Sequence, residues 1–166
     1  GGWAGGARAG RGGMGGLTTA VLVGGRRFPE GPGWHDGRSV FSDQHDAKVW
    51  SLTPDGTLTK VIDVPNRPSG LGWDRLGRML IVSMDDRRLL RLDGDTLPGC
   101  ADLSLLATWH CNALVVDAAG RAYIGNFGFD LDGGVEPVGT VLIRVDPDGS
   151  LHVAADNIRF PNGTVI

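Results

Sequence analysis

Four polar residues with oxygen-bearing side chains, Glu30, Ser69, Asn112 and Asn162, lie 39, 43 and 50 residues apart along the chain. One carboxylate, one hydroxyl and two amides are hard oxygen donors, which suit Ca²⁺, Mg²⁺ or Mn²⁺ better than a thiolate zinc site would. The alternative is that these side chains only hydrogen-bond to neighbouring backbone and water. Residue type alone leaves both interpretations open. The arrangement of the strands that carry the four residues decides whether their side chains can meet at one cation.

Each polar residue lies in a short segment, and the four segments resemble one another. They cover residues 29–34, 68–73, 111–116 and 161–166. A Gly-Arg pair follows each of the first three segments, at Gly37-Arg38, Gly77-Arg78 and Gly120-Arg121. This constant phase indicates an internal repeat of about 40–45 residues, a period typical of propellers and solenoids.

Each repeat has the pattern of four short strands and no helical periodicity. After the first segment we expect second strands at 39–41, 79–82 and 122–124, third strands at 48–52, 88–92 and 141–145, and fourth strands at 58–62, 103–106 and 151–154. Pro-Asp-Gly turns at 54–56 and 147–149 supply hairpin chemistry. The sequence therefore predicts an all-β β-propeller, with a β-sandwich as the alternative.

The first strand of a propeller blade lines the central channel. The repeat register then places Glu30, Ser69, Asn112 and Asn162 at equal heights on neighbouring blades. A longer third repeat adds a loop between Asn126 and Thr140. This loop contains Asp and Glu residues but lacks the spacing of an EF-hand, so we interpret it as a solvated rim loop.

Three motifs resemble those of a known family. Phe28-Pro29-Glu30-Gly31-Pro32-Gly33-Trp34 resembles the opening metal-ligand motif of SMP-30/gluconolactonase/LRE-like (regucalcin-like) proteins, residues 111–117 with 120–126 are similar to their central segment, and Phe160-Pro161-Asn162-Gly163 resembles their Pro-Asn-Gly motif. The resemblance extends from about residue 17 to 166. It implies a six-bladed propeller with one divalent cation in the channel, and lactone hydrolysis in several members.

The resemblance also assigns roles to residues. Glu30 and Asn162 are the expected metal ligands, and Asn112 and His110 are the expected substrate-binding residues. His110 stands where many members have Arg, Ala113 where an Asp is common, and Asn126-Phe127 where Thr-Met is common. The general base is expected on a carboxylate beyond residue 166. Calcium is the preferred cation, with zinc, manganese and magnesium as alternatives.

Six blades of this period need roughly 270 residues. The 166 residues therefore predict an N-terminal fragment: a Gly-rich disordered tail over 1–16, and about three and a half four-stranded blades over 17–166. For the full-length protein we expect a divalent-metal-dependent hydrolase of sugar-type lactones. The alternative is a non-catalytic propeller that binds calcium or another ligand.

Composition narrows the class of partner. The chain has 16 Lys and Arg residues and 19 Asp and Glu residues, so its charge does not favour binding to nucleic acid. We find no apolar run of about 18 residues for a membrane span and no apolar core of a signal peptide. The two cysteines, Cys100 and Cys111, make no disulfide framework and are expected to be reduced. The expected partner is a small lactone or sugar acid, and the expected location is cytoplasmic.

Overall fold

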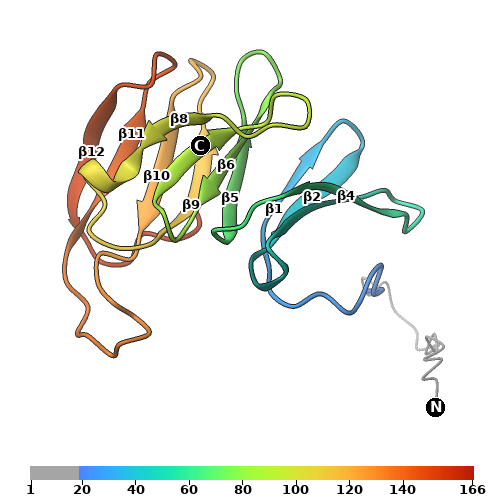
Figure 1. The fold of residues 1–166 in the computed structure, drawn as a ribbon, viewed down its shortest axis with the longest axis horizontal. Coiled ribbons are helices and arrows are strands. Elements are labelled where there is room, and N and C mark those ends of the chain that lie inside the picture. The colour runs from blue at the N-terminus through green and yellow to red at the C-terminus, as the bar shows by residue number, and fades with distance from the viewer. Residues whose placement is uncertain (1–18) are drawn as a thin grey trace, which may run out of the picture.

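The computed structural model describes residues 19–166, which form three four-stranded antiparallel sheets (Figure 1). The first sheet consists of β1 (Pro29–His35), β2 (Arg38–Asp43), β3 (Lys48–Leu52) and β4 (Leu58–Asp63). The second consists of β5 (Pro68–Trp73), β6 (Met79–Ser83), β7 (Arg88–Arg91) and β8 (Gly99–Asp102). The third consists of β9 (Cys111–Val116), β10 (Ala122–Asn126), β11 (Thr140–Val145) and β12 (Leu151–Ile158).

Within each sheet the strands pair in chain order, so each repeat folds as one up-and-down sheet. The first strands, β1, β5 and β9, are neighbours from one sheet to the next, and β4, β8 and β12 lie at the outer edges. The prediction of an incomplete propeller built from four-stranded blades is confirmed. The Gly-rich tail predicted at 1–16 lies outside the described residues.

One predicted strand is wrong. Residues 103–106 do not form the fourth strand of the second sheet: that strand is β8, and Leu103–Leu105 form a short 3₁₀ helix, η2. The Asp102 carboxylate accepts a hydrogen bond from the Ser104 backbone N–H, which caps this turn. Leu103 is completely buried in the core. The leucines of this segment therefore reflect a turn that closes over the core rather than an alternating strand.

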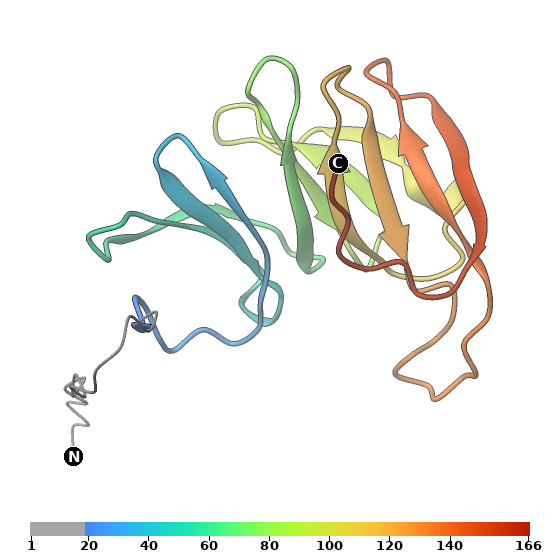
Figure 2. The same ribbon diagram turned by 180° about the vertical axis from the view of Figure 1, so that it is seen from behind.

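The fourth polar segment also differs from expectation. Residues 161–166 have no regular secondary structure, because no strand in the described part of the chain pairs with them. They run back beside β9 (Figure 2). Thr164, Val165 and Ile166 line a cleft together with Val115 of that strand. The segment therefore still occupies the place next to β9 that the repeat assigns to it.

The hydrophobic core lies between the sheets. Met79 and Ile81 of β6 pack with Val40, Val49 and other residues toward the first sheet. The alternate residues, Leu80 and Val82, pack with residues of the third sheet. Successive side chains of a strand point to opposite faces. The continuous apolar run of β6 is thus explained by burial of both faces of the second sheet.

Small residues let the first strands approach one another closely. A Cβ atom added at Gly70 would overlap the backbone nitrogen of Leu114 and lie 2.7 Å from the carbonyl oxygen of Asn112. One added at Gly31 would lie 3.0 Å from the carbonyl oxygen of Ser69. Both glycines directly follow a polar residue of the repeat, so the backbone contact between sheets occurs beside the candidate ligands.

Substitution of Gly70 tests this contact. Gly70→Ala should lower the free energy of unfolding by about 1–3 kcal/mol or more, because its methyl group meets backbone atoms that cannot rotate away. Gly99→Ala in β8 is the matched control, since its nearest contact would be an Arg88 side-chain nitrogen at 3.9 Å. Urea unfolding of both variants measures the difference. Equal stability of the two variants would contradict the close approach of β5 and β9.

Candidate metal centre

Three of the four repeat-related polar residues line one cavity of about 250 Å³. Glu30 comes from β1, Ser69 from β5 and Asn162 from the segment after β12. Backbone and small residues complete the wall: Gly31, Pro32, Gly70, Leu71, Ala113, Leu114, Gly163 and Thr164. The register therefore brings together residues that are up to 132 positions apart in the sequence.

A buried aspartate fixes the segment that leads into Glu30. Asp43, at the end of β2, accepts hydrogen bonds from the backbone N–H groups of Arg27 (3.0 Å) and Phe28 (2.9 Å). Burial raises the pKa of Asp43, but these hydrogen bonds outweigh it and the net pKa is lowered. The carboxylate of Glu30 accepts a 3.3 Å hydrogen bond from the backbone N–H of Gly31. Asp43 thus positions Glu30 through the backbone.

Ser69 is buried and already has protein partners. Its hydroxyl accepts a 3.3 Å hydrogen bond from the Gln44 side-chain amide, and its carbonyl oxygen accepts one of 2.6 Å from the Ser42 hydroxyl. These bonds tie β5 to the first sheet. Ser69 therefore has a clear structural role at the wall of the cavity.

Asn112 is different, because its amide has no partner. The side chain is 4 % exposed, and neither its Oδ1 nor its Nδ2 makes a hydrogen bond with the described part of the chain. An unsatisfied buried polar atom costs about 1–3 kcal/mol. The other buried asparagine, Asn126, is satisfied: its Nδ2 donates to the Val141 carbonyl (2.8 Å) and its Oδ1 accepts from the Thr140 hydroxyl (2.7 Å). The amide of Asn112 therefore lacks a partner among residues 19–166, and Asn112 itself does not line the cavity.

The donor set fits a hard cation. Among residues 19–166 no group of three or more His, Cys, Asp or Glu side chains could hold a metal ion. Glu30 instead lines its cavity with a serine hydroxyl and the Asn162 amide. Carboxylate and amide oxygens are ligands of Ca²⁺ and Mg²⁺, and Ca²⁺ also accepts neutral oxygens readily. These residues can supply part of a cation's coordination shell.

His110 lies two residues before Asn112 and belongs to a polar cluster that sequence reasoning missed. The Nδ1 atom of His110 lies 3.5 Å from Oδ1 of Asp85, and its Nε2 lies 3.4 Å from Nη2 of Arg67. Arg67 also donates from Nε to the same Asp85 oxygen at 2.7 Å. Arg67 precedes Ser69 by two residues, as His110 precedes Asn112. This equivalent position in the repeat is the sequence signal that could have identified Arg67 as a partner of His110.

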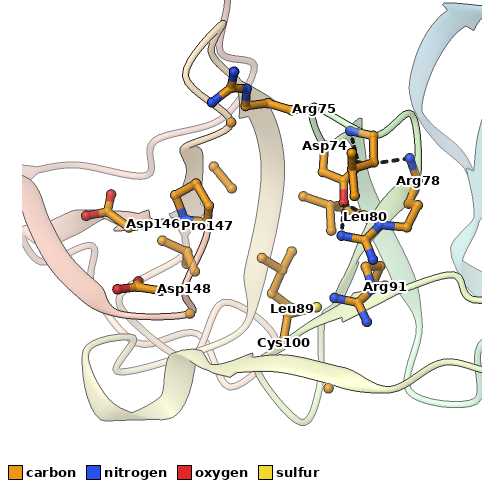
Figure 3. A pocket seen from close by; sticks show the side chains of 16 residues that line it. Asp74, Arg75, Arg78, Leu80, Leu89, Arg91, Cys100, Asp146, Pro147 and Asp148 are labelled. Carbon is orange, nitrogen blue, oxygen red and sulfur yellow. Dashed lines mark hydrogen bonds and ion pairs between the residues drawn. The ribbon is translucent and has the colours of Figure 1, made fainter.

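A second, larger cavity of about 370 Å³ lies between the second and third sheets, at the opposite end of β5 (Figure 3). Its wall includes Arg75, Arg78 and Arg91. Arg78 is paired with Asp74 at 2.8 Å and Arg91 with Asp93 at 2.6 Å. Because two of the three arginines already have carboxylate partners within the protein, this cavity has less free charge than its composition suggests.

The cysteines offer no nucleophile. Both are free, and burial raises the pKa of Cys111 to about 12. Burial also raises the pKa of Cys100, which is partly exposed. A thiol is nucleophilic as the thiolate, so neither residue is prepared for attack near neutral pH. In the part of the chain that the structure describes, no helix is long and apolar enough to cross a membrane.

Comparison with known proteins agrees with this architecture. The model of the SMP-30/gluconolactonase/LRE-like region matches residues 28–166. The pentonolactonase XacC of Haloferax volcanii is 27 % identical over 151 residues, covering 88 % of this chain and 48 % of that protein. The chain thus spans about half the length of this curated relative.

Solved structures show the same fold. A gluconolactonase of Xanthomonas campestris superposes with a TM-score of 0.71 at 24 % identity, covering 86 % of this chain and 52 % of that one. A calcium-binding regucalcin of Agrobacterium tumefaciens superposes with a TM-score of 0.67 at 22 % identity, covering 83 % and 46 %.

The two buried asparagines provide a matched stability test. Asn112→Leu should leave the free energy of unfolding unchanged or raise it, because it removes two unsatisfied polar atoms. Asn126→Leu should lower that free energy by roughly 1–3 kcal/mol, because it leaves the partners of Asn126 unsatisfied. Urea unfolding measures both. A larger loss for Asn112→Leu than for Asn126→Leu would contradict a vacant amide at residue 112.

The lowered pKa of Asp43 predicts a pH effect. A folded pKa below the unfolded value contributes stability above the unfolded pKa, near 3.9, and this contribution is lost as the pH falls through the folded pKa. Asp43→Asn should therefore destabilise the protein at pH 7, and the difference from the wild type should shrink below about pH 4. Asp95→Asn, at an exposed position, is the control. A difference that stays constant from pH 7 to pH 3 would rule out the ionised Asp43 as the anchor.

Proposed function

This chain belongs to the SMP-30/gluconolactonase/LRE-like family, and we propose that its full-length protein is a divalent-metal-dependent hydrolase of sugar-type lactones. The lactonase names of the relatives support this reaction class. Since the chain spans about half of their length, the proposal concerns the full-length protein and the part that residues 19–166 play in it.

The observation that carries the proposal is the meeting of Glu30 and Asn162 in one cavity, whose wall includes Ala113, the residue after the unpaired Asn112. Burial of a carboxylate is costly without a cation or strong hydrogen bonds, and Glu30 is partly buried. Glu30 has only a 3.3 Å bond from the next backbone N–H group, so a cation would satisfy it better. Glu30 and Asn162 would hold this ion.

Calcium is the preferred ion for such neutral and anionic oxygens, with zinc, manganese and magnesium as alternatives. The structural similarity to a calcium-binding regucalcin supports calcium. A bound divalent cation would polarise the lactone carbonyl as a Lewis acid. Protein side chains would bind the substrate and take the proton from the attacking water.

Asn112 and His110 would bind the substrate. The Asn112 amide can donate from Nδ2 and accept at Oδ1, and neither atom has a partner among residues 19–166. His110 would contact the substrate further out. From the family resemblance, we place the base that takes a proton from the attacking water on a carboxylate beyond residue 166. The two free cysteines suit a reducing, cytoplasmic location.

The proposal is tested by lactone hydrolysis in the full-length protein, with and without a chelator. Removal of divalent ions should abolish the opening of a sugar lactone, and added Ca²⁺ should restore it. Glu30→Gln should lower kcat/KM by roughly 100-fold or more, because it removes the charged ligand. Glu136→Gln, in the exposed loop between β10 and β11, is the control and should keep full activity.

Two results would count against the proposal. Undiminished hydrolysis in the presence of the chelator would exclude metal dependence. Tight calcium binding by calorimetry without hydrolysis of any lactone in a broad panel would favour the alternative, a non-catalytic calcium- or ligand-binding propeller.

A further inference from the structure

A cluster of three polar side chains lies at the end of the first strands where the polar repeat residues are found. It consists of Arg67, Asp85 and His110, and we refer to it as the Arg67 cluster. Arg67 and His110 each precede a polar repeat residue by two positions. Arg67 directly precedes β5 and His110 directly precedes β9, so the cluster lies at the ends of those strands where Ser69 and Asn112 are found. A substrate bound at Asn112 would extend toward it.

The charges within the cluster are balanced. Nη2 of Arg67 lies 2.5 Å from Oδ1 of Asp85, and Nε donates to the same oxygen at 2.7 Å. A His110 tautomer with its proton on Nδ1 satisfies both of its contacts, with Asp85 and with Arg67. The pKa of Arg67 is raised, chiefly by the hydrogen bond to Asp85 and also by the charge of Asp132 in the long loop. An anionic ligand therefore finds no net positive charge here.

Two hydrogen-bonding groups of the cluster remain free. Nη1 of Arg67 donates to no group in the described part of the chain, and Oδ2 of Asp85 accepts from none. The side chains of Arg67 and Asp85 are 29 % and 35 % exposed, so both are partly open to solvent. A free donor beside a free acceptor complements a pair of adjacent hydroxyl groups, since each hydroxyl both donates and accepts.

An aromatic wall connects the cluster to Asn162. The ring of His110 meets the edge of Phe127 at 6.2 Å, and Phe127 stacks on Phe160 at 4.8 Å. Phe160 lies two residues before Asn162 and in turn contacts Phe129 at 6.0 Å. Flat apolar rings next to polar groups offer a surface for the C–H faces of a sugar ring.

The backbone of Arg67 supports a specific role. Arg67 has a φ of 55°, in the left-handed region that non-glycine residues rarely adopt. Its carbonyl oxygen accepts a 3.0 Å hydrogen bond from the Met84 backbone N–H, and the neighbouring Asp85 N–H donates to Asn66 at 3.1 Å. These bonds hold the two halves of the ion pair in one fixed geometry. Such strain of order 1–3 kcal/mol persists where the surrounding structure maintains it.

We propose that Arg67 and Asp85 are specificity-determining residues, which bind two adjacent hydroxyl groups of the substrate. This inference rests on the proposed function and names the residues that select the substrate at that same site. Arg67 donates from Nη1 to one hydroxyl oxygen, Asp85 accepts at Oδ2 from the other hydroxyl, and His110 holds both side chains in place.

The test compares two six-membered lactones in the full-length protein: D-glucono-1,5-lactone, which has ring hydroxyls, and δ-valerolactone, which has none. Arg67→Met should lower kcat/KM for the glucono-lactone by about 10- to 100-fold, mainly through KM, because hydrogen bonds to a charged group are lost. The value for δ-valerolactone should change by less than about twofold. Asp85→Asn should act in the same direction, and Arg67→Lys should recover part of the loss.

Arg78→Met is the matched control, because Arg78 forms a similar pair with Asp74 at the far end of the second sheet. It should leave the ratio of kcat/KM for the two lactones unchanged. Equal losses on both lactones in Arg67→Met, or no loss on either, would overturn the inference while leaving the lactonase proposal intact.

Hydrolysis of neither lactone by the wild type would instead defeat the proposed function. Binding of 1,5-anhydro-D-glucitol, which has adjacent ring hydroxyls and no lactone, then decides the inference by calorimetry. Weaker binding by Arg67→Met than by the wild type supports it. Equal binding by the two proteins, or no binding by either, refutes it.

Discussion

The close contact between the first strands of successive sheets is the constraint on which the candidate site depends. At Gly70 the backbone of β5 approaches that of β9 so closely that a methyl group would meet main-chain atoms. Gly31 makes a comparable approach to Ser69. Because these small residues directly follow Glu30 and Ser69, the same contact that joins the sheets also brings their polar side chains to one cavity. Larger residues at these positions would separate the candidate ligands.

Some buried polar groups of the site have hydrogen-bond partners that stabilise the backbone, whereas the Asn112 amide has none in the described part of the chain. Asp43 and Ser69 make hydrogen bonds that fix the backbone around the cavity. The Asn112 side chain is also buried, but it makes no hydrogen bond with the part of the chain that the structure describes. A core that is packed on both faces of β6 can carry the cost of an unsatisfied amide of about 1–3 kcal/mol. Such a cost is characteristic of positions kept for ligand binding rather than for stability.

Much of the architecture could be predicted from the sequence, because the repeat specifies both strand order and the height of each residue. The three sheets and the meeting of Glu30 with Asn162 follow from this register. The strand predicted at 103–106 was wrong, because apolar spacing alone does not distinguish a strand from a capped turn over the core. The pairing of Arg67 with Asp85 was missed, because register gives the height of a side chain and not its partner across a loop.

The spacing of two residues between Arg67 and Ser69, and between His110 and Asn112, has an evolutionary consequence. Residues two apart on a strand share a face but contact different neighbours along the axis. Mutations at the outer positions can therefore accumulate without disturbing the inner ones, and the loop between β10 and β11 can change in length with them. The inner and outer positions of such a repeat can therefore vary independently of one another.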